Sequence, residues 1–150
     1  MNWSDYKRQI RHLTTQYGIR GIIVGAVPLV IKDDKDRQGG KIVIGHPGIQ
    51  FKDGAHLIVR ETVRANQITL ECQSYTYHYE RPSGYFFRYE RELTTDPVRK
   101  PEFHLHVMTD LPHYPSGAVT LGKVLEFIDI NFYSTQYHRT VVGQEIHLVV

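Results

Sequence analysis

Five side chains in the middle of this 150-residue chain are of the types that move protons or stabilise a charged intermediate. Histidine and glutamate serve as general acids and bases, and arginine stabilises the charge that develops on a phosphoryl group. The candidate catalytic residues are therefore Glu61, His78, Arg88, His104 and His106. On a strand, His104 and His106 would share one face, about 7 Å apart at Cα.

The pair His104 and His106 is open to three interpretations. Two imidazoles on one strand face can bind zinc or another divalent ion, can act as acid and base, or can simply be solvated. The strand itself offers no third ligand, although Glu102, Asp110 and His113 are close in the sequence. We therefore predict no metal and no cofactor.

Tyrosine is frequent, with 10 copies, and several tyrosines alternate along one segment. Aromatic rings beside an arginine form the kind of surface on which bases stack and phosphates pair. The same pattern is also good strand-forming sequence, in which cross-strand contacts stabilise a sheet. The candidate nucleic-acid-binding residues are Tyr75, Tyr77, Tyr79 and Tyr89.

The candidate residues lie on segments whose alternation is typical of β-strands. A helix is expected before them, where apolar residues recur at steps of three and four from Trp3 to Tyr17, and another after them, from Leu121 to Phe132. The sequence predicts an α+β fold: a mainly antiparallel, curved sheet of five to seven strands, flanked by an N-terminal and a C-terminal helix, in a single domain over 1–150. The expected strands span 41–46, 55–63, 68–80, 85–92 and 102–108.

Three further segments complete this expectation. The apolar run 19–31 suggests one buried strand or two short ones. Residues 32–40 form the charged tip of a hairpin, and 145–150 could add a last strand.

A symmetric turn at Arg81–Gly84 would place Glu80 opposite Tyr85. Arg88 would then share a face with Tyr75, Tyr77 and Tyr79, whereas Glu61 and His78 would lie together at the apolar face. A one-residue bulge would reverse this assignment.

The composition excludes several functional classes. Hydrophobic residues make up 41% and the formal net charge is +2, as in an ordinary globular domain and unlike a strongly basic nucleic-acid binder. Cys72 is the only cysteine, which excludes an internal disulfide and fits a reducing cytoplasm. The sequence has no phosphate-binding glycine loop, no Gly-x-Ser-x-Gly motif and no membrane-length apolar run. We therefore expect a cytoplasmic location and no membrane partner.

The order of motifs from about residue 51 to 130 resembles the TumE-type toxins. These are small bacterial and archaeal proteins encoded beside a helix-turn-helix antitoxin. The motifs that carry the resemblance are Asp53-Gly54, Leu57-Ile-Val-Arg-Glu61, Tyr75-Thr-Tyr-His-Tyr79, Phe87-Arg88-Tyr89, His104-Leu-His106 and the helix from about Thr120 to Ile128. This chain departs from the family in having Glu90 where an aspartate is usual, and in a thinner histidine cluster.

The resemblance implies a toxin that acts on RNA and is neutralised by a helix-turn-helix antitoxin. On this hypothesis the chain is a metal-independent ribonuclease in which a histidine and Glu61 move protons while Arg88 stabilises the phosphorane. One alternative is a non-catalytic module that binds a protein or a nucleic acid. The other is a small His-dependent metalloenzyme.

Overall fold

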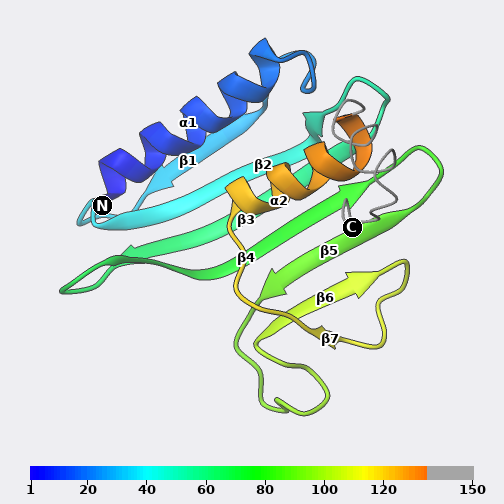
Figure 1. Cartoon of the computed structure of the whole chain (residues 1–150). Helices are drawn as coiled ribbons and strands as arrows, with labels where there is room; N and C mark the ends of the chain where they lie inside the picture. The colour runs from blue at the N-terminus through cyan, green and yellow to red at the C-terminus, as the bar shows by residue number, and fades with distance from the viewer. Residues whose placement is uncertain (135–150) are drawn as a thin grey trace, which may run out of the picture. The chain divides into compact units, whose positions relative to one another are not determined.

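The computed structural model describes residues 1–134, and it confirms the predicted α+β fold. Within these residues, seven strands form one antiparallel sheet in which each strand pairs with the next along the chain, and the sheet is not closed. The strands are β1 (Leu29–Asp33), β2 (Gly39–Gln50), β3 (His56–Ala65), β4 (Leu70–Glu80), β5 (Phe86–Arg91), β6 (Phe103–Val107) and β7 (Tyr114–Pro115) (Figure 1). The helices are α1 (Trp3–Ile19) and α2 (Leu121–Ile128).

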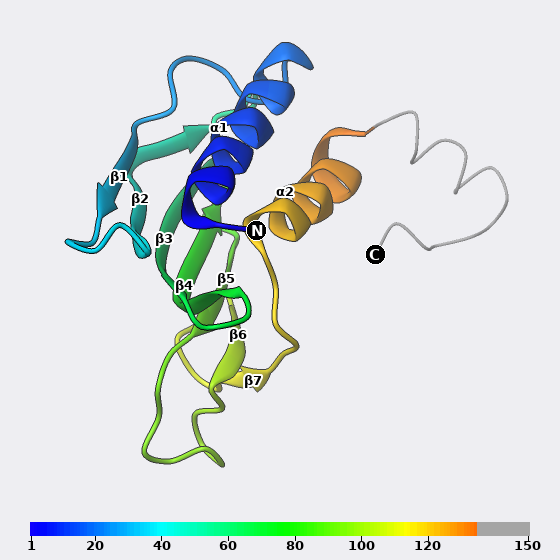
Figure 2. The same cartoon turned by 90° about the vertical axis from the view of Figure 1, so that its left-hand side faces the viewer.

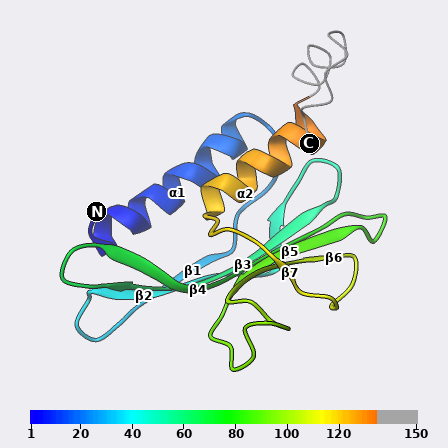
Figure 3. The ribbon, with the colours of Figure 1, turned by 60° about the horizontal axis from the view of Figure 1, so that its bottom comes forward.

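Helix α1 lies on one face of the sheet (Figures 2 and 3). Asn2 caps its first turn, because the Asn2 side chain accepts a hydrogen bond from the backbone N–H of Asp5 at 2.9 Å. The predicted apolar stripe is confirmed, since Trp3 and Ile10 are buried. The Trp3 indole N–H donates to the Asp33 carboxylate at 2.8 Å and so ties the start of α1 to the end of β1.

The segment between α1 and β2 is only partly regular. Residues 19–31 contain an isolated bridge between Ile23 and Phe51 before β1 begins at Leu29. The charged residues 32–40 do form the end of the β1–β2 hairpin, as the sequence predicts. Arg64, near the end of β3, pairs there with Asp34 and Asp36 of the tip. Each exposed ion pair is weak, but together they fix the tip against β3.

The two faces of the sheet carry different residue types. The core face carries apolar side chains, and among its fully buried members are Ile42, Ile44, Leu57, Val59, Tyr77 and Tyr79. The polar face carries the residues that alternate with them. We define the polar face by Lys32, Lys41, Arg60, Thr62, Ser74, Thr76, His78, Arg88, Glu90, His104 and His106.

Because of a β-bulge in β4, the apolar side chains of both halves of that strand point to the core face. Thr62 pairs with Ser74 but Val63 pairs with Cys72, so Gln73 is an extra residue. Strict alternation without this bulge would put Cys72 and the tyrosines of β4 on opposite faces, whereas in the structure they share the core face. The bulge shifts the alternation by one position, so the apolar residues before Gln73 and those after it lie on the same face.

The described residues fall into two compact units, one ending at Ala118 and the other starting at Val119. In the second unit, Thr120 caps α2 by accepting a hydrogen bond from the backbone N–H of Lys123. A π-helical turn follows over Asp129–Tyr133. The predicted strand at 145–150 lies outside the described residues, and the single-domain assignment stays a prediction. In the part of the chain that the structure describes, no helix has the length and apolar character needed to cross a membrane.

Candidate functional site

The turn between β4 and β5 differs by one residue from the symmetric turn that the sequence suggests. Glu80 pairs with Phe86 and not with Tyr85, so the predicted register is wrong. The backbone N–H of Arg81 donates to the carbonyl of Tyr85, which leaves a loop of three residues, 82–84. Gly84 closes this loop with a φ of 87°, a conformation that glycine adopts without strain. Because strand side chains alternate, this single step moves every β5 side chain to the other face.

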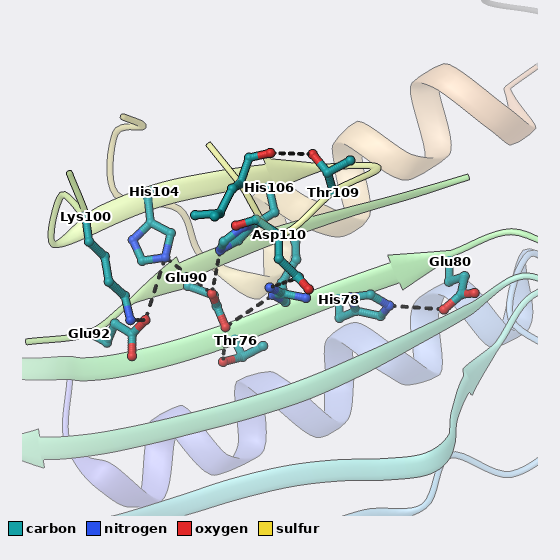
Figure 4. Close-up of polar contacts among 12 residues, drawn as sticks. Thr76, His78, Glu80, Glu90, Glu92, Lys100, His104, His106, Thr109 and Asp110 are labelled. Atoms are coloured by element: carbon teal, nitrogen blue, oxygen red, sulfur yellow. Dashed lines mark hydrogen bonds and ion pairs between the residues drawn. The ribbon is translucent and has the colours of Figure 1, made fainter. Parts of the chain in front are cut away.

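The observed register assembles four of the five candidate catalytic residues on the polar face. Arg88 lies opposite His78 on one side and opposite His106 on the other, and Glu90 lies opposite His104. Figure 4 shows Glu90 pointing toward both histidines of β6, with His78 further along the same face. Chemistry-bearing side chains from three adjacent strands therefore form one cluster.

The fifth candidate, Glu61, lies on the core face. It is 3% exposed, and its two carboxylate oxygens accept hydrogen bonds from the hydroxyls of Tyr77 at 2.6 Å and Tyr6 at 2.7 Å. Burial raises the pKa of Glu61, and the two hydrogen bonds offset this only in part. The prediction that Glu61 and His78 share a face is wrong, because the β4 bulge and the pairing of β3 with β4 place them on opposite faces.

The four candidate nucleic-acid-binding tyrosines also lie on the core face. Tyr75, Tyr77 and Tyr79 are buried, and the rings of Tyr75 and Tyr77 stack with centroids 4.8 Å apart. Tyr89 pairs with Tyr77 and is half-buried. In this arrangement the rings pack against the core, and their role in base stacking stays a prediction from the sequence.

The two histidines of β6 are buried and held by backbone carbonyls. His104 is 0% exposed and His106 is 2% exposed. The Nδ1–H of His104 donates to the carbonyl of Pro101 at 2.6 Å, and that of His106 donates to the carbonyl of Asp110 at 3.0 Å. Their Nε2 atoms lie 3.3 and 2.9 Å from one oxygen, Oε2 of Glu90. Both rings are thus fixed at each end.

Three residues that the sequence analysis did not choose complete this cluster. Glu90 joins the histidines to the open part of the polar face, and Glu92 approaches Nε2 of His104 at 3.7 Å. The ring centroid of His113 lies 4.9 Å from that of His104 and 4.8 Å from that of His106. Glu90 could have been found only with the correct register, and His113 was visible as a near neighbour in the sequence.

Arg88 and Glu90 are coupled electrostatically. Burial alone would raise the pKa of Glu90, but the nearby charge of Arg88, followed by the contact with His106, outweighs burial and lowers the pKa. One Arg88 nitrogen, Nη2, donates to the exposed Asp110 at 3.0 Å. The buried Nε lies 3.3 Å from Oε1 of Glu90 but makes no hydrogen bond within the described residues.

A groove of about 430 Å³ adjoins this cluster on the sheet. Its polar lining includes Lys41, Arg60, Thr76, Glu90 and Glu92. Glu90 therefore belongs to both the groove and the histidine cluster.

Basic side chains lie near one end of the groove. Lys32 lies directly opposite Lys41 in the β1–β2 ladder, an arrangement that is unfavourable because like charges repel. Arg60 lies one strand further along the polar face. For these three cations the described part of the chain supplies no ion-pair partner. Such a set of cations is suited to an anionic ligand.

No family model, no curated protein and no solved structure matches this chain. Its function is therefore argued from the cluster and the groove.

Proposed function

We propose that the polar face binds RNA and cleaves its phosphodiester backbone, as the resemblance to TumE-type toxins implies. The observation that carries this proposal is the β4–β5–β6 register, which sets Arg88 between His78 across the ladder and Glu90 two residues along the strand. A cation between two groups that exchange protons is the arrangement needed for attack by a 2′-hydroxyl on the adjacent phosphate.

The positions on the polar face support a division of roles. Lys41 and Arg60 hold the phosphate backbone in the groove. Glu90, whose lowered pKa keeps it ionised, takes the proton of the 2′-hydroxyl. Arg88 stabilises the charge on the phosphorane, and His78 gives a proton to the leaving 5′-oxygen.

Burial limits what the remaining two histidines can do. His104 and His106 are too buried for a nucleotide to reach, and both contact Glu90. Their part in this proposal is to orient Glu90. Glu90 also takes the place that the sequence analysis gave to Glu61, which lies on the other face.

A cleavage assay on a labelled single-stranded RNA tests the proposal. We expect Arg88→Gln and Glu90→Gln each to reduce the cleavage rate about 100-fold or more, and His78→Gln to reduce it in the same range. RNA binding, measured by fluorescence anisotropy, should change much less in all three. Arg99→Gln is the matched arginine control, because Arg99 is 89% exposed in its side chain and lies on the β5–β6 loop.

Two outcomes would contradict this assignment. Cleavage that is equally fast in wild type and in all three variants would exclude these residues as the catalytic group. RNA binding by the wild type without any cleavage would instead favour the alternative of a non-catalytic nucleic-acid-binding module. The supporting observation for that alternative is the set Lys32, Lys41 and Arg60, which has no ion-pair partner among residues 1–134.

The toxin role and its partner form a separate part of the proposal. If cleavage of cellular RNA is the toxic activity, expression of the wild-type chain should arrest growth and Arg88→Gln should relieve the arrest. A helix-turn-helix antitoxin would restore growth when expressed with the wild type. Equal growth arrest by wild type and Arg88→Gln would separate toxicity from the cleavage site.

A further inference from the structure

The contacts of Glu90 with the β6 histidines are unusual because two ring nitrogens approach a single oxygen. Nε2 of His106 lies 2.9 Å and Nε2 of His104 lies 3.3 Å from Oε2 of Glu90 (Figure 4). The two imidazoles are nearly perpendicular, with an interplanar angle of 80° and centroids 5.0 Å apart. Two ring nitrogens and one carboxylate oxygen thus meet at one point.

The other nitrogen of each ring fixes where its proton lies. The Nδ1 atoms of His104 and His106 both face backbone carbonyls, which only accept hydrogen bonds, so each Nδ1 carries a hydrogen. In a neutral imidazole, Nε2 then has a free lone pair. A cation bound among these atoms would be coordinated by both lone pairs and by the carboxylate oxygen.

The orientation of both rings also fits a bound ion. A ring held by Nδ1–H against a backbone carbonyl, with Nε2 pointing inward, is the usual orientation of a metal-ligating histidine.

Further ligands are present around the same point. Candidate ligand atoms of His104, His106 and His113 lie within 4.8 Å of one another, and so do those of Glu90, Glu92 and His104. Ligand atoms about 2.1 Å from a tetrahedral ion are about 3.4 Å apart, so the contacts to Glu90 already have nearly this spacing. His113, which is half-buried, supplies the third imidazole of this set.

We propose that His104, His106, His113 and Glu90 bind one divalent transition-metal ion of the zinc class. Three imidazoles and one carboxylate suit zinc and its neighbours, whereas calcium and magnesium require mainly oxygen ligands. The proposal differs from the sequence-based expectation of no metal, because Glu90 is recognised as a ligand only with the register, and the structure brings His113 to the pair. It does not depend on the proposed cleavage of RNA.

Metal binding is tested with the ion alone and with protein from which any affinity tag has been removed. The chain is stripped with a chelator and titrated with Zn²⁺ by calorimetry, and separately with Co²⁺, whose visible absorption reports a tetrahedral nitrogen–oxygen site. We expect one ion per chain. His113→Gln should weaken Zn²⁺ binding about 10-fold or more, and His106→Gln and Glu90→Gln should weaken it at least as much.

His46→Gln provides the matched control, because His46 is exposed and lies on β2, outside the cluster. Circular dichroism of each variant separates loss of ligand from loss of fold, and His113→Gln is the most informative variant because its ring is the least buried of the three. The site is supported if His46→Gln leaves Zn²⁺ binding unchanged and His113→Gln weakens it.

Three results would overturn the metal site: no Zn²⁺ binding by the wild type at 1:1 stoichiometry, equal affinity in wild type and folded His113→Gln, or ¹⁵N spectra that show His104 and His106 doubly protonated at neutral pH. Because no RNA is present, failure here leaves the RNA proposal standing. Conversely, loss of RNA cleavage in His78→Gln with normal Zn²⁺ binding would separate the two functions.

Discussion

Each carboxylate oxygen of Glu61 accepts a hydrogen bond from a different tyrosine hydroxyl. This arrangement predicts how Glu61 affects the stability of the fold. The pKa of Glu61 is raised by burial in the folded chain, so the folded state binds its proton more tightly than the unfolded state does. Its contribution therefore favours folding below the unfolded pKa of about 4.3 and is lost as the pH rises through the folded pKa. Glu61→Gln removes this dependence.

We therefore expect the free energy of unfolding of wild type, relative to Glu61→Gln, to fall as the pH rises above about 4.3 and then to level off. Urea unfolding of both proteins across this pH range measures the difference. Glu61→Ala leaves the hydroxyls of Tyr6 and Tyr77 without their acceptor and should cost about 2–4 kcal/mol. A difference between wild type and Glu61→Gln that does not change with pH would contradict the assignment.

Cys72 makes a second prediction at the scale of one residue. Burial raises the pKa of its thiol to about 12, and the nearby Glu61 adds to this. Because of this raised pKa, the thiolate fraction at pH 8 should be about 1,000-fold lower than for an ordinary cysteine. Only the thiolate reacts with alkylating agents. Alkylation by iodoacetamide should slow accordingly in the folded chain and return to the ordinary rate in urea. Equal rates in both states would show that the thiol is not protected.

At the scale of elements, the packing of β1 and α1 against β2 depends on a glycine without room for a side chain. A Cβ at Gly40 would lie 2.1 Å from the carbonyl oxygen of Lys32 and 2.9 Å from the ring of Trp3. Gly40→Ala should therefore force these strands apart and cost about 2–3 kcal/mol. Thermal or urea unfolding measures the loss. Gly117→Ala is the control because a Cβ there meets no atom within 4 Å, and similar stability of the two variants would contradict the close packing.

The sequence predicts the elements of this fold better than their faces. Alternating apolar positions identify the strands, and the stripe from Trp3 identifies α1, because both patterns follow from burying one face. Which residues share a face depends on two single-residue features, the extra Gln73 in β4 and the three-residue loop closed by Gly84. The change of apolar phase between Cys72 and Tyr75 is a sequence signal of the first. The second depends on the backbone conformation of Gly84, and the sequence is equally compatible with a symmetric loop.

The same two features decide what the candidate site contains. The sequence analysis chose Arg88, His104 and His106 from their chemistry alone, and the register then brings these side chains together with Glu90. Glu61 has equally suitable chemistry but is buried on the apolar face, where the strand alternation predicts it. Residue type therefore identifies candidates, but a site is defined only when the strand register is known.

At the scale of the whole molecule, the net charge of +2 is small, so any attraction for a polyanion depends on where the cations lie. Lys32 and Lys41 face each other across the β1–β2 ladder, which costs stability because like charges repel. If this arrangement serves to bind RNA, the variant Lys41→Glu should affect stability and binding in opposite directions. It replaces a repulsive pair with an attractive one and at the same time removes a phosphate contact.

We expect Lys41→Glu to raise the free energy of unfolding by about 0.5 kcal/mol. It should also weaken the binding of single-stranded RNA and reduce the slope of log K against log salt by about 1. Urea unfolding and anisotropy titrations at several salt concentrations measure the two effects on the same preparations. Arg99→Gln, which removes an exposed positive charge away from the groove, should leave the salt slope nearly unchanged.

The opposite signs make this test specific, because a simple folding defect would lower both stability and binding. A more stable Lys41→Glu that binds RNA as tightly as wild type would show that the facing lysines do not form a phosphate site. The basic end of the groove would then have to be assigned to another anion, whereas the cluster around Arg88 and Glu90 would keep its own test in the cleavage rate.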